Sequence, residues 1–398
     1  MKASQVFTPA APIDAERLFA GRIGQLRRVV DAVNQKGQHA IVFGERGVGK
    51  TSLANIISTK ISGPVLPARI NCDSANTYSS LWKRMFGQIT FARTTQGIGF
   101  GADVTTTIST VAEQLDSQIT PDYVRQVLAS LSGVFPILII DEFDRIANTQ
   151  VKTAIADTIK TLSDHAIAAT IVLVGVADSV DQLIEQHQSI ERALVQIQMP
   201  RMSNDELYEI LDNGLQTLEM AIDEAAKQEI AFLSRGLPHY AHLLGLHSVR
   251  AAVDGKSSTI SLAHVEAAIS EALRQAQQSI QSAYHKATTS ARKDNIFSQV
   301  LLACALARTD DLAYFAAGDI RDPLRTITGR AYDIPNFSPH LYAFCEHERG
   351  PVLQKTGIPH RYRYRFINPL MQPYIVMQGK TKGLLDKEKL AAIKRGQK

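Results

Sequence analysis

The chain has 398 residues, of which 45% are hydrophobic and 21% charged, the composition of an ordinary globular protein. This length exceeds one ordinary hydrophobic core and predicts two or three domains. No stretch approaches the ~20 uninterrupted apolar residues of a membrane helix. Residues 1–14 lack the basic segment and following apolar run of a secretory signal. We therefore expect no membrane partner.

Charge is distributed unevenly along the chain. The net charge is +4, yet residues 291–398 hold 18 Lys and Arg against 10 Asp and Glu, so the remainder is slightly acidic. A basic C-terminal third suggests a polyanionic partner for that third alone. The cysteines, Cys72, Cys304 and Cys345, lack metal-ligand or redox spacing. We expect them to be small buried side chains in a protein of the reducing cytoplasm.

The first two hundred residues alternate between helical and strand patterns. Residues 15–36 carry apolar side chains at helical spacing. Short apolar segments predict strands at 39–43, 65–70, 136–140 and 170–174, and a further strand is expected at 195–199. Residues 92–107, where glycines alternate with threonines, predict an exposed loop or hairpin. Strands that alternate with helices indicate an α/β nucleotide-binding layer with a parallel sheet.

Helical patterns replace strands after Pro200. Four such patterns, at 205–220, 223–234, 239–253 and 262–284, predict an all-helical domain. From residue 294 short helices precede two strand-like segments around a turn at 356–360, and helices followed by such a hairpin describe a winged helix-turn-helix. The expected domains are a nucleotide-binding core at 1–201, a helical lid at 202–288, a winged helix at 289–383 and a frayed basic tail at 384–398.

Residues 44–51 (GERGVGKT) match the full pattern G-x-x-x-x-G-K-[ST]. The glycines allow backbone N–H groups to turn toward phosphates. We expect Lys50 to reach the β- and γ-phosphates and the Thr51 hydroxyl to bind Mg²⁺. The motif follows a strand and opens a helix, whose N-terminus attracts anions. The predicted contacts to ATP are Gly44, Glu45, Arg46, Gly47, Val48, Gly49, Lys50, Thr51 and Ser52.

An acidic pair ends the apolar strand at 138–140. Asp141 is expected to hold Mg²⁺, directly or through water, and Glu142 to polarise the attacking water. This pair predicts an enzyme that hydrolyses ATP to ADP and phosphate rather than a passive nucleotide switch. Asp144 is expected to be a loop or capping residue.

The P-loop, the acidic pair, a third strand that ends in a polar residue and a helical lid together resemble the AAA+ ATPases. Within them the chain is most similar to the origin-recognition initiator group and its bacterial relatives. The segments that carry this likeness are Phe19-Ala-Gly-Arg22, Val174-Gly-Val-Ala-Asp178 and the expected winged helix. The resemblance covers essentially the whole chain and implies an α/β P-loop core, an all-helical lid and a C-terminal winged helix-turn-helix.

The resemblance implies catalytic roles for two further residues. Asp178 stands where the family has its first sensor, usually Asn, although it could instead cap the helix that starts near Ser179. Arg192 stands where the family has an arginine finger, which acts on ATP bound by a neighbouring subunit and so implies a homo-oligomer. The alternative for Arg192 is a surface salt bridge.

The resemblance also implies contacts to the nucleotide outside the P-loop. His239 replaces the usual arginine of the second sensor and could instead be a core or helix-start histidine. Phe19 and Arg22 belong to the segment that flanks the adenine, although Phe19 could simply pack on a helix.

Arginine and aromatic residues alternate over 361–366. On a strand Arg361, Arg363 and Arg365 would share one face, free for phosphates, while the aromatic side chains pack on the domain. With Lys355 across the turn, these arginines are the predicted DNA contacts. Helix 336–347 would be the recognition helix, although Glu346 and Glu348 near its end argue against deep insertion into a groove. The alternative is a module that binds protein.

These features together predict an ATP-hydrolysing protein that binds duplex DNA, in which nucleotide controls assembly or the recruitment of another protein. Two alternatives remain open. One is a STAND-type signalling or defence ATPase whose winged helix binds an effector protein, and the other is a transposon target-selector ATPase. Stimulation of ATP hydrolysis by duplex DNA would favour the DNA-binding ATPase or the transposon target selector over the STAND-type signalling ATPase.

Overall fold

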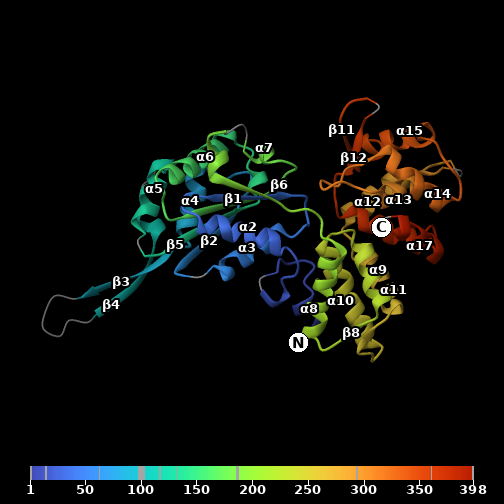
Figure 1. Cartoon of the computed structure of the whole chain (residues 1–398), viewed down its shortest axis with the longest axis horizontal. Helices are drawn as coiled ribbons and strands as arrows, with labels where there is room; N and C mark the ends of the chain where they lie inside the picture. The colour runs from blue at the N-terminus through green and yellow to red at the C-terminus, as the bar shows by residue number, and fades with distance from the viewer. Residues whose placement is uncertain are drawn as a thin grey trace.

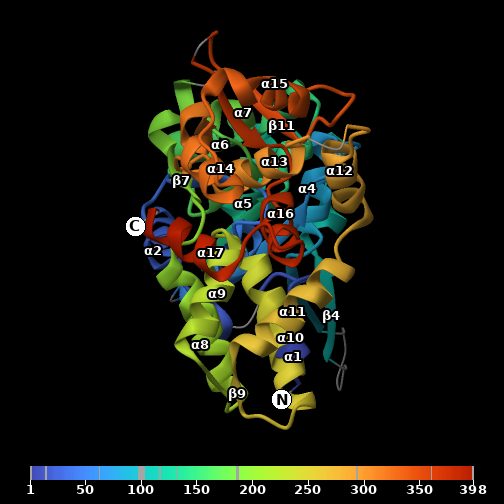
Figure 2. The same ribbon diagram turned by 90° about the vertical axis from the view of Figure 1, so that its right-hand side faces the viewer.

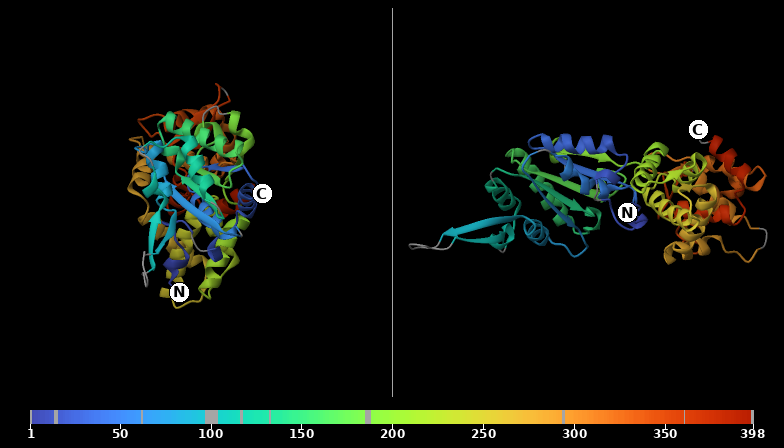
Figure 3. Two further views of the ribbon diagram at one scale, coloured as in Figure 1. Left: turned by 90° about the vertical axis from the view of Figure 1, so that its left-hand side faces the viewer. Right: turned by 90° about the horizontal axis from the view of Figure 1, so that it is seen from below.

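The computed structural model describes residues 2–13, 16–61, 63–96, 104–115, 118–131, 133–184, 188–292, 295–359 and 361–396. The molecule is elongated (Figure 1). An α/β layer occupies one end, and the helical segment after residue 200 and the C-terminal elements occupy the other. The view from below shows the same arrangement and places the N-terminus near the middle (Figure 3).

The α/β layer is built on a five-stranded parallel sheet with the order β2-β5-β6-β1-β7. Its strands are β1 (His39–Gly44), β2 (Val65–Asn71), β5 (Phe135–Asp141), β6 (Thr170–Val176) and β7 (Leu194–Gln198). The expected α/β fold with a parallel sheet is thus confirmed. Because parallel strands end at the same edge, the segments after β1, β5 and β6 meet there, which brings the P-loop close to the acidic pair.

Helices cover both faces of this sheet, so alternate strand residues enter two separate hydrophobic cores. Ala40 and Val42 point into one core, and Ile41 and Phe43 into the other. The covering helices are α2 (Ile23–Asn34) and α3 (Lys50–Ile57) on one face and α4 (Tyr78–Phe86), α5 (Pro121–Ser130) and α6 (Thr149–Asp164) on the other. Shorter elements are α1 (Ala3–Val6), α7 (Val180–Leu183) and 3-10 turns at Glu16–Leu18, Ser58–Lys60, Val111–Gln114, Phe143–Arg145, Gln188–Ala193 and Ala317–Ile320.

The helix expected over 15–36 is interrupted. Gly21 and Arg22 have φ values of 64° and 59°, which end the Glu16–Leu18 turn and make Arg22 the residue that precedes α2. An arginine with positive φ is uncommon and is retained here by the contacts described below.

A two-stranded antiparallel hairpin projects from the α/β layer (Figure 1, lower left). It consists of β3 (Thr90–Gln96) and β4 (Val104–Thr110). The hairpin alternative for this region is therefore correct, and the glycines at 97, 99 and 101 lie outside the described residues.

The segment after Pro200 is helical, as expected, with α8 (Asn204–Thr217), α9 (Glu224–Ser234), α10 (Pro238–Asp254), α11 (Leu262–Arg274) and α12 (Gln278–Thr288). The fourth predicted helix is two helices, because the chain turns at residues 275–277. The expectation that no strands follow Pro200 is wrong in one detail. Two-residue strands, β8 (Ala221–Ile222) and β9 (Thr259–Ile260), pair in parallel within this segment.

The C-terminal part contains α13 (Phe297–Leu306), α14 (Arg321–Thr328), α15 (Ile334–Cys345) and a three-stranded antiparallel sheet with the order β10-β12-β11. Its strands are β10 (Phe315–Ala316), β11 (Leu353–Thr356) and β12 (Arg363–Phe366), of which the sequence analysis missed β10. Assignment of these elements to a winged helix-turn-helix remains a prediction. Helix α16 (Met371–Thr381) follows and returns toward the rest of the molecule.

The last helix, α17 (Lys387–Gly396), lies beside α14 (Figure 2). Leu390 and Ile393 are buried, and the Lys389 ammonium donates a hydrogen bond to the Ile327 carbonyl at 3.0 Å. The expectation of a frayed tail is therefore wrong, because apolar residues spaced three apart attach this helix to the C-terminal part. Within the described ranges no helix is long and apolar enough to cross a bilayer. Cys72 and Cys304 are buried, as expected, and Cys345 is partly exposed.

Candidate nucleotide-binding site

A cavity of about 670 Å³ lies at the carboxyl edge of the parallel sheet, a size typical of small-molecule sites. Its lining includes the P-loop, with Lys50 and Thr51, and the acidic residues Asp141 and Glu142. The N-terminal segment 8–13, residues 18–20 and side chains of α8 and α10 also line it. Core and helical segment thus share one cavity.

The P-loop glycines have the backbone conformations that the motif predicts. Gly44, Gly47 and Gly49 have φ values of 150°, 87° and 97°. A Cβ at Gly44 would come within 2.5 Å of the Met199 carbonyl oxygen, so any side chain there would displace the loop from β7. The glycines therefore allow both the turn and its close approach to the sheet.

Lys50 is buried at the start of α3, with 8% of its surface exposed. Its ammonium donates hydrogen bonds to the carbonyl oxygens of Gly44 (3.0 Å) and Glu45 (2.8 Å). Burial lowers the pKa of Lys50 to about 8, although the nearby carboxylates of Asp144 and Asp141 oppose that shift. The loop carbonyls thus hold this ammonium in the cavity wall.

Asp141 is 3% exposed at the end of β5. One carboxylate oxygen accepts a hydrogen bond from Arg69 Nη2 at 2.6 Å and the other from the Glu142 backbone N–H at 2.8 Å. Since protein donors already engage both oxygens, this carboxylate fits Mg²⁺ best through a bound water. The sequence analysis missed Arg69, although an arginine in the otherwise mostly apolar β2, which pairs with β5, was an available signal.

The residues present fit a magnesium ion that enters with its nucleotide. Thr51 and Asp141 both line the cavity and offer oxygen atoms. No group of three or more His, Cys, Asp or Glu side chains could hold a metal among the residues that the structure describes. In nucleotide enzymes phosphates and waters supply most of the ligands of magnesium.

Glu142 follows Asp141 with a φ of 55°, a strained value for a non-glycine residue. Its carboxylate lines the cavity and accepts a hydrogen bond from Arg145 Nη1 at 2.9 Å. Both side chains of this pair are about half exposed, so the contact is weak and readily exchanged for water. The Asp144 carboxylate accepts from the Val176 backbone N–H at 2.7 Å, the loop role expected for it.

Three predicted contacts outside the P-loop also line the cavity: Phe19, Arg22 and His239. Arg22 is 2% exposed, and its Nη2 donates to the carbonyls of Val48 (3.1 Å) and Pro200 (2.5 Å), which ties the P-loop to the segment after β7. The Nδ1 atom of His239 lies 2.8 Å from the Pro9 carbonyl, so His239 holds the N-terminal segment against α10.

Asp178 and Arg192 do not line this cavity. Asp178 forms an ion pair with Arg365 of β12 and accepts a hydrogen bond from the Tyr314 hydroxyl at 3.3 Å. Arg192 is exposed in a small polar recess beside Lys160 and Asp164. Within one chain the structure therefore separates both residues from the P-loop.

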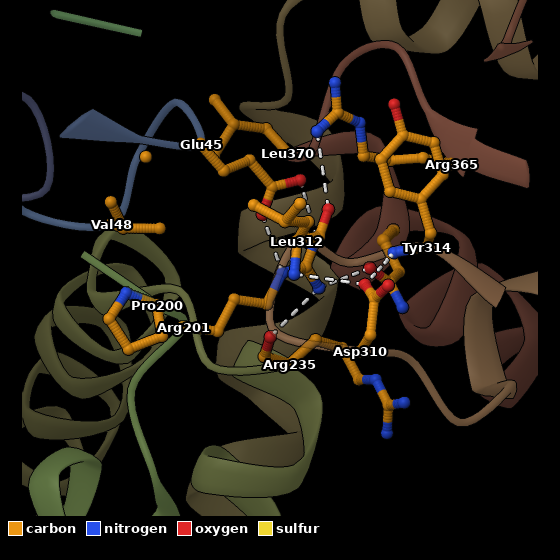
Figure 4. A network of polar contacts seen from close by, with 12 residues as sticks. Glu45, Val48, Pro200, Arg201, Arg235, Asp310, Leu312, Tyr314, Arg365 and Leu370 are labelled. Atoms are coloured by element: carbon orange, nitrogen blue, oxygen red, sulfur yellow. Dashed lines mark hydrogen bonds and ion pairs between the residues drawn. The ribbon is translucent and has the colours of Figure 1, made fainter. Parts of the chain in front are cut away.

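The C-terminal part instead reaches the nucleotide cavity at residues that the sequence analysis missed. Arg201, just after β7, forms a two-bond ion pair with Glu45 of the P-loop (2.8 and 3.0 Å) and also donates to the Arg235 carbonyl and to Gln372 of α16 (Figure 4). Leu370 lines the cavity, and its carbonyl accepts from the Tyr240 hydroxyl at 2.7 Å. Glu45, Arg201 and Gln372 thus connect the P-loop, the sheet and the C-terminal part.

The four predicted DNA contacts do not share one free face. Arg361 is exposed, whereas Arg363 pairs with Asp310 at 3.0 Å and Arg365 pairs with Asp178. Lys355 is directly opposite Tyr364, hence on the aromatic face, with its ammonium 5.1 Å from the centre of the Tyr342 ring. The alternation of faces is confirmed by the burial of Tyr364 and Phe366, but the expectation of a free arginine face is wrong for Arg365 because the α/β core covers it.

Residues 33–184 match the protein-family model described as an AAA domain. Among solved structures, the ORC2 protein of Aeropyrum pernix is similar with a TM-score of 0.50 and 15% identity, over 95% of this chain and 98% of that one. A Walker-type ATPase of Pyrococcus abyssi is similar with a TM-score of 0.51 and 15% identity, over 92% and 98%. No curated protein matches the sequence significantly. Residues 33–184 are thus similar to an AAA domain, and the fold of the chain resembles that of the ORC2 protein of Aeropyrum pernix.

Proposed function

We propose that the protein binds ATP with Mg²⁺ and hydrolyses it, and that the bound nucleotide controls an assembly on duplex DNA. The observation that carries the ATPase proposal is the cavity itself. It brings Lys50 and Thr51 of the P-loop together with Asp141 and Glu142 of a different strand. Glu142 has a strained backbone and a half-exposed carboxylate in the cavity. A site that only bound phosphate would not need this residue, whereas hydrolysis needs a base for the attacking water.

Each residue in the cavity has a role in this proposal. The Lys50 ammonium exchanges its hydrogen bonds to loop carbonyls for hydrogen bonds to phosphate oxygens. The backbone N–H groups of residues 47–51 surround the same phosphates. Thr51 and, through a bound water, Asp141 would hold Mg²⁺, which would neutralise charge on the phosphates. Glu142 exchanges its hydrogen bond with Arg145 for one with a water molecule. It then orients that water and accepts a proton from it.

Arg192 completes the site from a neighbouring subunit in this proposal. Its side chain is exposed and outside the cavity of its own chain, as a residue that acts on another subunit must be. An Arg192→Ala variant should bind ATP normally but hydrolyse it poorly, and addition of the Lys50→Ala protein should restore activity. Hydrolysis by a strictly monomeric wild-type protein, at a specific rate independent of concentration, would contradict the trans arrangement.

The DNA-binding part of the proposal rests on the basic C-terminal third and on the exposed Arg361. The ion pair between Asp178 and Arg365 favours a second candidate, a signalling ATPase whose C-terminal part binds protein, because it assigns a predicted DNA contact to the protein's own core. Duplex DNA should stimulate ATP hydrolysis if the first function is correct and should leave it unchanged if the second is.

The ATPase proposal is tested by a pair of variants that separate binding from hydrolysis. Lys50→Ala should lose measurable ATP binding, because it removes the ammonium that the carbonyls of Gly44 and Glu45 hold in the cavity wall. Glu142→Gln should bind ATP with unchanged affinity and lose turnover by at least about a hundredfold, since only activation of water is removed. Wild-type turnover in Glu142→Gln would exclude Glu142 as the activating base.

A further inference from the structure

An arginine outside the cavity holds one carboxylate of the acidic pair. Arg69 of β2 pairs in register with Ile139 of β5, two residues before Asp141. Its Nη2 atom donates to one Asp141 oxygen at 2.6 Å, and the Glu142 backbone N–H donates to the other at 2.8 Å. Asp141 lines the cavity, whereas Arg69 is not among the described residues that line it. Arg69 therefore contacts Asp141 and would not contact a ligand in the cavity.

The helix that follows the P-loop fixes the guanidinium on its other side. Arg69 Nη1 donates to the Oδ1 atom of Asn55, which lies on α3 four residues after Thr51. The Asn55 amide in turn donates to the Ile13 carbonyl at 3.1 Å. The planar fork of donors on one arginine thus connects the helix after the P-loop with the end of β5.

The acidic side chains among the described lining residues differ in how their charge is balanced. Asp144 is exposed and accepts from a backbone N–H, and Glu142 pairs with an arginine in contact with water. The Asp141 side chain is only 4% exposed, and its partner Arg69 is 26% exposed. Water screens this pair less than a surface pair, so Arg69 provides most of the charge compensation for Asp141.

A buried carboxylate without this partner would repel the phosphates of a nucleotide in the same cavity. A bound Mg²⁺ ion would also offset the charge of Asp141, but only while the ion is present. Arg69 offsets that charge at all times, because an arginine side chain in a protein stays protonated. The protein therefore has a permanent cation beside the carboxylate that faces the phosphates.

We propose that Arg69 is a positioning residue that neutralises Asp141, so that the site binds ATP with little dependence on Mg²⁺. The inference rests on the proposed nucleotide site and adds to it the residue that separates nucleotide binding from metal binding. Hydrolysis requires Mg²⁺ in this arrangement, whereas affinity for the nucleotide does not.

The test compares two arginines near the same edge of the sheet. Arg69→Met removes the charge with a side chain of similar length. The control is Arg84→Met, because Arg84 donates to the Asn71 carbonyl at the end of β2 and pairs with the exposed Asp73. Calorimetry would measure ATP binding to the full chains in excess MgCl₂ and in excess EDTA. Arg69→Met should weaken binding in EDTA by about tenfold, the order expected for one charge near the phosphates, and change binding in Mg²⁺ less. Arg84→Met should leave both affinities unchanged.

A second comparison distinguishes charge compensation from a purely structural role. In the double variant Arg69→Met with Asp141→Asn no carboxylate remains to be neutralised, so ATP affinity in EDTA should return to the wild-type value. A side chain that only packs would not be rescued in this way. Thermal melts show whether Arg69→Met alone is folded. If it is not, Asp141→Asn and the double variant carry the test, and the double variant should bind ATP in EDTA about tenfold more weakly than Asp141→Asn.

The outcomes separate this inference from the function on which it rests. A wild-type protein that binds no ATP in either buffer would overturn the nucleotide site itself. Wild-type binding in Mg²⁺ that disappears in EDTA would overturn the inference and leave the nucleotide site intact. Equal affinities in EDTA for the chains with and without Arg69, whether Asp141 is present or replaced, would also overturn the role of Arg69.

Discussion

The P-loop and the strand β12 both concentrate charged residues in a short pattern, but those charges have different partners. Lys50 donates to carbonyls five and six residues away along the chain. Arg363 and Arg365 pair with Asp310 and Asp178, which are 53 and 187 residues away. The comparison teaches that a pattern predicts side-chain roles well where the partners lie within the pattern, and poorly where tertiary contacts supply them.

The largest expected effect comes from the ion pair between Arg201, just after β7, and Glu45 of the P-loop. Arg201→Ala would leave the Glu45 carboxylate buried without its partner, since the two side chains are 16% and 9% exposed. Loss of one member of such a pair costs about 3 kcal/mol. Urea unfolding of the full chain should show this loss. The control is Arg274→Ala, which breaks an exposed pair with Glu271 and should leave stability nearly unchanged. Equal stabilities of the two variants would contradict the structural role of Arg201.

A second prediction concerns the pH dependence of ATP binding. The pKa of Lys50 in the free protein is about 8, and a bound phosphate must raise it because an anion favours the charged ammonium. ATP affinity is therefore highest below the pKa that Lys50 has in the free protein. It falls as pH rises above that pKa, by up to about tenfold per pH unit. Calorimetry across alkaline pH measures the decline. Lys50→Arg, which stays protonated, should bind with an affinity independent of pH in the same range.

Most of the fold could be predicted because its signals are local. The predicted strand segments match all five strands of the sheet to within one or two residues at each end. The P-loop and the acidic pair meet because both follow strands of one parallel sheet, whose strands end at the same edge. Arg201 could not be predicted, because it acts through partners on distant elements, whereas the arginine in the mostly apolar β2 was an available signal for Arg69. The two-residue strands β8, β9 and β10 carry too few residues for any periodicity.

A third prediction measures the contact between β12 and the core. The side chains of Arg365 and Asp178 are 15% and 23% exposed, so the pair is partly screened and should contribute about 1 kcal/mol. Thermal melts of Arg365→Ala, Asp178→Ala and the double variant give the coupling energy directly. Arg361→Ala, on the same strand-like segment but exposed, is the matched control and should leave stability unchanged. A coupling energy of zero would show that the two regions are not joined in solution.

The smallest expected effect is a difference between Arg361 and Arg363 in their contributions to DNA affinity. Arg361 is exposed, so it can meet a phosphate at no internal cost, whereas Arg363 must first leave Asp310. Arg361→Ala should reduce the slope of log affinity against log salt by about 0.9, the value for one phosphate contact. Arg363→Ala should change the slope less. Asp310→Asn should strengthen binding a few-fold, because it frees Arg363 and removes a negative charge.

Fluorescence anisotropy of a labelled duplex across a salt series measures all three variants. Tyr364→Ala is the control for the other face, since Tyr364 is 2% exposed and should affect stability rather than slope. Equal slopes for wild type, Arg361→Ala and Arg363→Ala would exclude this hairpin as the DNA-binding surface. The arginines of β12 would then serve the contact with the core, and a protein partner would become the better assignment for the C-terminal part.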